Sequence, residues 1–205
     1  MNDSQSFVCE GDKQMNKKEM IVHAAIEVFR EQGIEKTKIS DIVKAAGIAQ
    51  GTFYLYFPSK LSLMPAIAEV MVVKTMAIVQ ASVQESATFS VQIEQLVEAI
   101  FQVTHDYHEI QALIYSGLAS TEHLKEWETV YAPFYQWISE RLQEAKEAGI
   151  IRSSIHADRT AKMIIGLVES AAEQIYLYDS EQEDQARIQQ AEVNDFLRHA
   201  LGMNG

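Results

Sequence analysis

The segment TKISDIVKAAGIAQGTFYLYFPSK, residues 37–60, predicts two short helices joined by a tight turn. Thr37 is a residue type that favours the N-cap of a helix, and Gly47 is typical of a helix end. The second short helix begins near Ala49 and must end before Pro58, because the residue preceding a proline is pushed away from α geometry. Two helices of this length bury little surface alone, so a further helix must pack across them.

The residues immediately upstream supply that helix. Asn16 and Glu19 have the spacing of a capping box, and Gly33 provides a stop. The apolar residues of one helical face are Ile21, Ala24, Ala25, Val28 and Phe29. The residues expected to complete the core beneath the two short helices are Ile39, Ile42, Val43, Ile48 and Phe53. The sequence therefore predicts a three-helix unit whose last two helices form a helix-turn-helix, at about residues 38–57.

The side chains expected on the outside of this unit are hydrogen-bond donors or aromatic rings with a polar tip. They are Lys38, Ser40, Gln50, Thr52, Tyr54 and Tyr56. In a helix-turn-helix the second helix enters the major groove, where its N-terminal side chains reach base edges. As an alternative, the tyrosine rings cover the small core and Lys38 and Lys44 are simply solvated. The polar, cationic face favours DNA binding, because a purely structural bundle has no need of it.

Residues 37–48 and 51–60 together resemble the signature of the TetR family of transcriptional regulators. The resemblance rests on the joint spacing of Gly47, Gly51, the cluster of Tyr54, Tyr56 and Phe57, and Lys60. It covers the first third of the chain, and the rest is similar only in general character. It implies a bacterial repressor that binds a palindromic operator as a homodimer and is released by a small-molecule inducer. An activator, or a regulator without a ligand, is the alternative on the same fold.

The resemblance also implies which residues touch DNA. Gly51 would let the backbone approach closely, and Gln50 and Thr52 would bond base edges. Hydroxyls and an ammonium would contact phosphate at Thr37, Tyr54, Tyr56 and Lys60. The complete predicted set is Thr37, Lys38, Ser40, Ala49, Gln50, Gly51, Thr52, Tyr54, Tyr56 and Lys60.

The sequence departs from the commonest family pattern at three places. Gln50 stands where a lysine is frequent, Leu61 and Ser62 stand where acidic residues often follow Lys60, and Pro65 falls inside the expected fourth helix. A proline in a helix interior removes a backbone donor, so a kink is expected there. These departures concern the operator sequence and the hinge, whereas the prediction of DNA binding is unaffected.

The whole chain is predicted to be all-α, because it has three prolines, nine glycines and no period-two alternation. A polar tail is expected at 1–15, a DNA-binding domain at 16–75 and a helical ligand-binding and dimerisation domain at 76–205. The fourth helix should run from a cap at Ser59 to about Gln84 and contain the domain boundary. Further helices are expected at 91–107, 109–118, 121–148 with a break near Pro133, 157–178 and 184–201.

The net charge of −12 is distributed unevenly along the chain. Residues 17–60 contain seven Lys and Arg against five Asp and Glu, a net +2, which leaves −14 for the remainder. This asymmetry is compatible with a DNA-binding unit joined to an acidic body. The lone Cys9 predicts no intrachain disulfide. No signal peptide is evident, and no run is expected to reach the roughly 20 apolar residues of a membrane span, so a cytoplasmic location is predicted.

Candidate ligand contacts are aromatic and polar residues of the C-terminal region. They are His105, Gln111, Tyr115, Trp127, Tyr131, Phe134, Tyr135, Trp137, Glu169 and Glu173. Ordinary core packing is the alternative for each aromatic residue, since pockets are lined by the same side chains. The two glutamates lie one turn apart on an otherwise apolar helix, and such carboxylates need partners. An arginine across a subunit interface or a cationic inducer would supply one.

The last two helices are expected to form the dimer interface, as the resemblance implies. The residues predicted to lie in it are Ile164, Gly166, Leu167, Val168, Ser170, Ala171, Ile175, Val193, Phe196, Leu197, Ala200 and Leu201. Small residues at near-helical spacing would permit close helix approach, and the apolar residues would supply buried area. The alternative is that both stripes pack only within the monomer.

Neither an enzyme nor a metal protein is indicated. His105, Asp106, His108 and Glu109 share a helix end, but a solvated charged surface is the favoured interpretation. No Glu-x-x-His pair, glycine-rich phosphate loop or nucleophile elbow occurs. The prediction is a protein without catalytic residues, metal or resident cofactor, whose partners are double-stranded DNA, a second copy of itself and an inducer. The rival is a helical ligand-binding or catalytic protein without DNA affinity.

Overall fold

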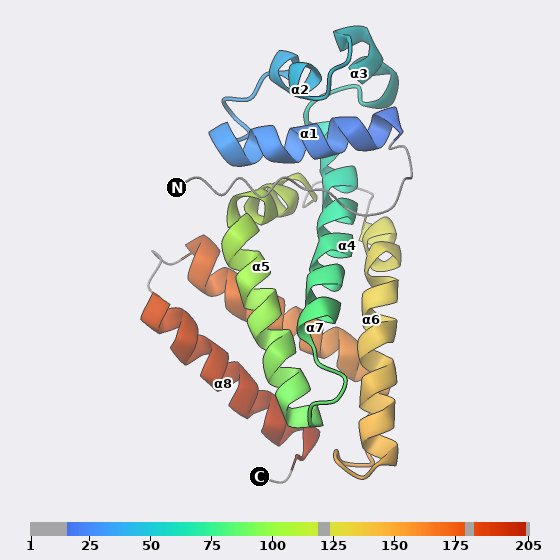
Figure 1. Cartoon of the computed structure of the whole chain (residues 1–205), viewed down its shortest axis with the longest axis vertical. Helices are drawn as coiled ribbons and strands as arrows, with labels where there is room; N and C mark the ends of the chain where they lie inside the picture. Colours follow the sequence, from blue (N-terminus) through green and yellow to red (C-terminus); the bar gives the residue numbers. More distant parts are fainter. Residues whose placement is uncertain (1–15, 119–123, 179–182, 204–205) are drawn as a thin grey trace.

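The computed structural model describes residues 16–118, 124–178 and 183–203, and within those ranges all regular structure is helical. Three helices form a cap at one end of the molecule: α1 (Lys17–Gln32), α2 (Ile39–Ala45) and α3 (Gln50–Tyr56). Below it lie α4 (Met64–Ser82), α5 (Phe89–Leu118), α6 (Leu124–Glu147), α7 (Ala157–Glu173) and α8 (Glu183–Leu201), as Figure 1 shows. The all-α prediction is confirmed. The expected tail at 1–15, with Cys9, lies outside the described residues.

The ends of α1 are formed by the predicted chemistry. The Asn16 side chain accepts a hydrogen bond from the Glu19 backbone N–H at 2.9 Å, and the Glu19 carboxylate accepts one from the Asn16 N–H at 3.0 Å. Gly33, with φ of 76°, ends the helix in a conformation that favours glycine. Gly47 ends the α2 turn in the same way, with φ of 66°.

The predicted N-cap at Thr37 is wrong, because α2 begins one residue later. Lys38 holds the N-cap position, and its backbone N–H donates to the Asp41 carboxylate at 2.9 Å. Thr37 is instead buried, and its hydroxyl donates to the Gly33 carbonyl at 2.7 Å. The hydroxyl therefore closes the loop between α1 and α2.

Pro65 does not kink the fourth helix. A short 3₁₀ turn, Leu61–Leu63, follows Lys60, and α4 begins only at Met64. Pro65 thus lies in the first turn of α4, where backbone N–H groups have no intrahelical acceptor and a proline is well tolerated. Ser59 assists the turn by accepting the Ser62 N–H at 3.2 Å.

The C-terminal helices follow the prediction closely, with three differences. The expected separation between 107 and 109 is a kink at Tyr107 (φ −127°, ψ 18°) within the single helix α5. The predicted break near Pro133 is wrong, because α6 runs through it. After α7 the chain continues as a π-helical turn, Gln174–Tyr178, so the expected helix to 178 changes its winding there. Gly149, with φ of 70°, follows α6.

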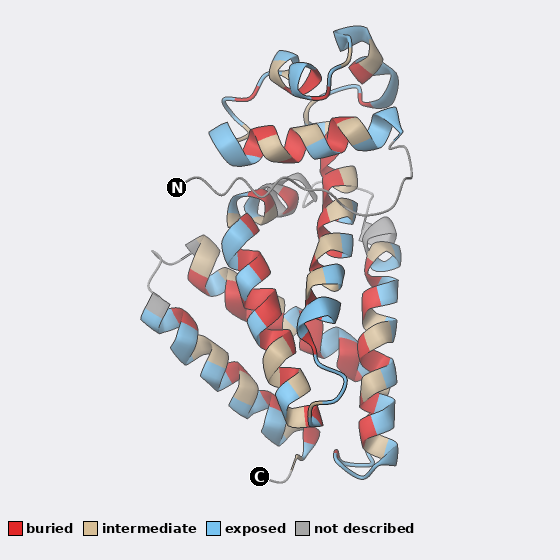
Figure 2. Ribbon diagram, viewed as in Figure 1, coloured by how far each residue is buried: buried red, intermediate tan, exposed pale blue. Residues whose placement is uncertain are grey.

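The described residues form two hydrophobic cores, and two helices contribute to both. One core joins α1, α2 and α3 to the first part of α4, up to Met71, and to the second part of α5, including Ile110 and Ile114. The other joins the rest of α4, from Val72, to the first part of α5 and to α6, α7 and α8. Figure 2 shows the buried residues continuing along α4 and α5 from one core to the other. The exact domain boundary, placed at residue 75 from the sequence, stays a prediction.

One segment, Leu61–Ser82, is long and apolar enough to cross a membrane, with a mean hydropathy of 1.7. This differs from the expectation that no such run exists. Its central position accounts for its composition, because α4 contacts α1, α5 and α6 and so needs apolar residues on several faces.

The position of Pro65 predicts that replacing it has little effect on stability. Pro65→Ala should change the free energy of unfolding by no more than about 1 kcal/mol. Val73→Pro, at an exposed position in the middle of α4, should lower it by about 3 kcal/mol or more. Urea denaturation of both variants measures this difference. A stabilisation of several kcal/mol in Pro65→Ala would show instead that the proline strains the helix.

Candidate DNA-binding surface and ligand region

The outer face of α3 is exposed while its inner face is anchored. Phe53 and Phe57, four residues apart, are both buried, and their ring centroids lie 5.9 Å apart. Tyr54 packs edge-on against Phe53 at 5.6 Å yet remains about half exposed, as does Tyr56. Gln50 is exposed and Thr52 is half-buried. The side chains predicted to reach DNA from α3 therefore project from a helix fixed by two phenylalanines.

Gly51 lies on the exposed face of α3 and is not required by the packing of this chain. A Cβ atom added there would meet no heavy atom within 4 Å, and its φ is not in the left-handed region. Neither backbone conformation nor internal crowding explains a glycine in the second position of a helix, where it is intrinsically unfavourable. A close approach by a second molecule would explain it.

The start of α2 adds a second exposed element. Lys38 and Ser40 are exposed, and within the described residues no ion pair of the Lys38 ammonium is found. Ala49, the N-cap of α3, is also exposed. Figure 1 shows α2 and α3 together at the end of the molecule opposite α8. These residues thus share one end of the molecule.

Two predicted phosphate contacts occupy other positions than expected. Thr37 is only 2% exposed, so its side chain does not belong to the surface. The half-buried Lys60 donates through its ammonium to the carbonyls of Ile34, at 2.5 Å, and Thr37, at 2.8 Å. Lys60 also precedes the 3₁₀ turn, so it is not in the first turn of the fourth helix as predicted. It fastens the loop before α2 to the base of α4.

Sequence reasoning missed Leu55 as an outward residue of α3. Its side chain is 82% exposed, the highest value among the large hydrophobic residues of the described chain. The signal was present in the sequence, because residue 55 lies two positions from both buried phenylalanines and must therefore point away from them.

The best-defined polar group of the C-terminal core is a pair between α6 and α7. The Tyr131 hydroxyl donates to the Glu169 carboxylate, with oxygen distances of 3.0 and 3.2 Å, and Tyr131 stacks on Tyr135 at 5.5 Å. Burial raises the pKa of Glu169 to about 8, against the lowering effect of the Tyr131 hydrogen bond, and Glu173 adds a further increase. Burial, with Glu128 and Glu169 nearby, raises the pKa of Tyr135 to about 12. The structure thus brings together three predicted ligand residues.

The other predicted ligand residues are scattered. Phe134 is fully buried in the core, and Trp137 packs beneath the Arg141 guanidinium, 3.7 Å from its ring centroid. His105 is exposed, and its ring packs edge-to-face with that of Tyr176, with 5.2 Å between the ring centroids. Gln111 is half-buried, and its enclosed side-chain amide oxygen has no hydrogen-bond partner among the described residues. The side chains of Tyr115 and Trp127 lie outside the described residues.

One cavity among the described residues lies apart from the predicted ligand residues. A shallow depression of about 680 Å³ lies between α6 and the start of α7, lined by charged and polar residues that include Ser139, Lys146 and Arg159. None of the predicted ligand residues lines it, and Trp137 alone among them borders a second, very small cavity. Across the described ranges, no three His, Cys, Asp or Glu residues gather as a metal site. His105 and His108 instead contact Asp106 and a backbone carbonyl.

The predicted dimer residues divide into two groups. Seven are buried in the core of this chain itself, which corrects their assignment to a surface: Ile164, Val168, Ala171, Ile175, Val193, Leu197 and Leu201. Five lie at least partly at the surface: Gly166, Leu167, Ser170, Phe196 and Ala200. Met163 and Ile188, both well exposed, lie on the same two helices and are not in the predicted set.

A helix-turn-helix with an exposed polar second helix, carried on an all-helical body, defines a DNA-binding protein of the bacterial regulator type. Family models agree: residues 21–67 match "Bacterial regulatory proteins, tetR family", and residues 93–201 match "Tetracyclin repressor-like, C-terminal domain". The chain belongs to the TetR family of transcriptional regulators.

Individual relatives extend over nearly the whole chain. The HTH-type transcriptional regulator YvdT of Bacillus subtilis is 40% identical over 91% of this chain and 95% of its own length. The regulator UidR of Escherichia coli K12 is 27% identical, covering 89% of each chain. The fatty acid degradation regulator FadR of Bacillus halodurans shares the fold, with a TM-score of 0.70, 24% identity and coverage of 91% and 96%. The chain is therefore a DNA-binding transcriptional regulator.

The contacts of Lys60 predict that it affects DNA binding by positioning α2. Lys60→Met should weaken binding to operator duplex, but the slope of log Kd against log salt concentration should remain that of the wild type. Lys38→Met should reduce this slope by about 0.9 for each subunit, because a phosphate contact releases counterions. Fluorescence anisotropy between 50 and 300 mM salt measures both. If Lys60→Met reduced the slope as much as Lys38→Met, its ammonium would contact phosphate directly.

The raised pKa of Glu169 predicts a pH dependence of stability. The folded chain keeps a proton on Glu169 that the unfolded chain loses near the usual carboxyl pKa of 4.5, so this stabilisation is complete below pH 4.5 and is lost as pH rises through about 8. Glu169→Gln should therefore be stabilised relative to the wild type more at pH 8 than at pH 5. Denaturation at both pH values tests this, and the exposed Glu140→Gln should show no such change. Equal effects of Glu169→Gln at both pH values would contradict the assignment.

Proposed function

We propose that this regulator is a repressor that binds a palindromic operator as a homodimer, in the cytoplasm, and leaves it when a small-molecule inducer binds the C-terminal domain. The observation that carries the proposal is the face of α3, where exposed Gln50, Tyr54 and Tyr56 surround Gly51 on a rigidly anchored helix. A helix so fixed holds its donors ready for base edges and phosphates. Predicted contacts at Lys38, Ser40, Ala49 and Thr52 extend the same surface.

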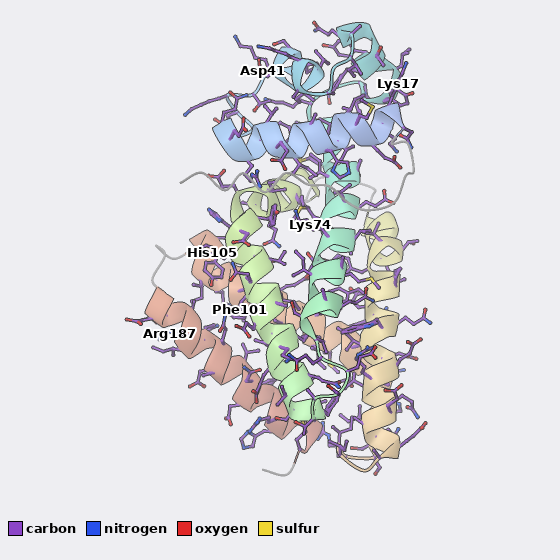
Figure 3. The ribbon with its side chains drawn as sticks, in the orientation of Figure 1. Lys17, Asp41, Lys74, Phe101, His105 and Arg187 are labelled. Atoms are coloured by element: carbon purple, nitrogen blue, oxygen red, sulfur yellow. The ribbon has the colours of Figure 1, made fainter. Side chains whose placement is uncertain are left out.

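The path from inducer to DNA would run through the two helices that both cores share. At the junction of the cores, the Lys74 ammonium of α4 contacts the hydroxyl of Tyr107 and lies 4.2 Å from the centroid of its ring. Tyr107 is the kink residue of α5, and Figure 3 shows Lys74 between these two helices. If a ligand moved the first part of α5, or the part of α4 from Val72 onward, the movement would therefore be transmitted to the unit that carries α3.

Dimerisation through α7 and α8 is supported by apolar surface that this chain leaves uncovered. Met163 of α7 is 64% exposed and Phe196 of α8 is 60% exposed, with Ile188 similar. A Cβ atom added at Gly166 would meet no heavy atom within 4 Å, so internal packing does not require a glycine there either. A second copy that packed its α7 and α8 against the same face would bury these residues, and its backbone could come close to Gly166.

The inducer is proposed to lie near the Tyr131–Glu169 pair, which is a hydrogen-bonded polar pair packed among apolar residues of the C-terminal core. Regulators of the same fold take up small molecules: the FadR of Bacillus subtilis is known in complex with stearoyl-CoA, and a regulator from Saccharomonospora viridis in complex with choline. We propose neither a catalytic activity nor a resident cofactor for this chain.

Binding to the DNA upstream of its own gene tests the proposal. The wild type should sediment as a dimer at micromolar concentration and shift the upstream duplex, and a promoter fusion should be more active when the regulator is deleted. Phe196→Arg should be folded by circular dichroism but monomeric, with binding weakened at least tenfold, because one half-site contributes too little. Val73→Arg, at an exposed position outside this face, is the matched control and should remain dimeric.

The possible failures are distinguishable. A monomeric wild type would overturn the dimer, and lower promoter activity on deletion would indicate an activator. Failure to bind any duplex in a random library would overturn the proposed operator binding.

A further inference from the structure

The geometry of α3 places one residue at the centre of its outward face. Successive residues of a helix are rotated by about 100°, so Leu55 lies about 200° from both Phe53 and Phe57. Those two side chains define the buried side, because their exposed fractions are 0% and 4%. The Leu55 side chain therefore points directly away from the core, and Gly51, one turn earlier, lies on the same outward side of the helix.

An exposed leucine in this position is chemically unlike its surroundings. Its neighbours on the surface, Gln50, Tyr54 and Tyr56, all carry polar atoms suited to base edges or phosphate. Leucine forms no hydrogen bond, and its 82% exposure shows that it contributes almost nothing to the core. When α3 enters a major groove, the central residue of the outward face is pressed against the base pairs, and the apolar group available there is the C5-methyl group of thymine.

We propose that Leu55 determines sequence specificity by packing against the methyl group of a thymine in each half-site. The inference rests on operator binding through α3. Side chains of a helix lean toward its N-terminus, so that of Leu55 leans toward Gly51, where no side chain occupies the space. The backbone can thus come close enough for a four-carbon side chain to reach the floor of the groove.

The geometry of α3 determines the position of Leu55 relative to Gln50. Leu55 is five residues after Gln50, which is about 7.5 Å along the axis of α3. The two residues are also about 140° apart around the helix, so their side chains would reach different bases. Gln50 would supply a polar contact and Leu55 an apolar one to neighbouring parts of the same half-site.

Uracil substitution tests the proposal directly, because uracil lacks only the methyl group. The probe is a duplex selected by the wild type from a random library, in which each thymine of both half-sites is replaced in turn by uracil. For one thymine position the wild type should lose about fourfold in affinity for each half-site, the effect of one buried methyl group. Leu55→Ala should bind the thymine and uracil duplexes equally, whereas Leu55→Met, which keeps an apolar side chain, should still prefer thymine.

Leu61→Ala is the matched control, since Leu61 is also an exposed leucine but lies in the 3₁₀ turn after α3. It should keep the full preference of the wild type for thymine. The inference is overturned if no single uracil weakens wild-type binding, or if Leu55→Ala keeps the full loss. Selection of a duplex by the wild type first establishes DNA binding, so failure of the methyl contact is separate from failure of the proposed operator binding.

Discussion

The sharing of α4 between two hydrophobic cores is the constraint on which the rest of the structure depends. Met71 packs with the helix-turn-helix unit, and the next residue, Val72, packs with the C-terminal helices. Close-packed cores resist small displacements, so neither can rearrange without acting on this helix. α5 repeats the arrangement, because Phe101 packs with the C-terminal helices and Val103 packs with the helix-turn-helix unit, and two shared helices oppose twisting better than one.

Short-range chemistry was readable from the sequence, and long-range contacts were not. The cap of Asn16 and Glu19 and the stop at Gly33 involve residues within four positions, and the structure confirms both. Lys60, by contrast, bonds carbonyls 23 and 26 residues earlier, and no periodicity indicates such a contact. The family resemblance suggested a phosphate contact for the same ammonium. The error at Pro65 has a local origin, because a 3₁₀ turn delayed the start of α4 by a few residues.

The candidate surfaces of the C-terminal domain show a second limit of sequence patterns. An apolar stripe indicates that a helix face is covered, but it does not indicate whether the same chain or a second molecule covers it. On α7, Ile164 and Val168 are covered by this chain, while Met163 and Gly166 on the adjoining face remain uncovered. The predicted ligand residues divide similarly: Tyr131, Tyr135 and Glu169 meet between α6 and α7, whereas Phe134 is ordinary core.

Charge and shape together determine how such a molecule can approach DNA. The segment from Lys17 to Lys60 carries a net +2, and the rest of the chain carries −14. DNA phosphates therefore repel the acidic C-terminal helices, and approach is favoured at the end formed by α1, α2 and α3. A weakly cationic face gives modest non-specific attraction, because that attraction scales with the number of phosphates neutralised. Discrimination must then come from contacts made only in the correct groove, such as those proposed for Gln50 and Leu55. An acidic body thus makes specificity depend on the few side chains of α3.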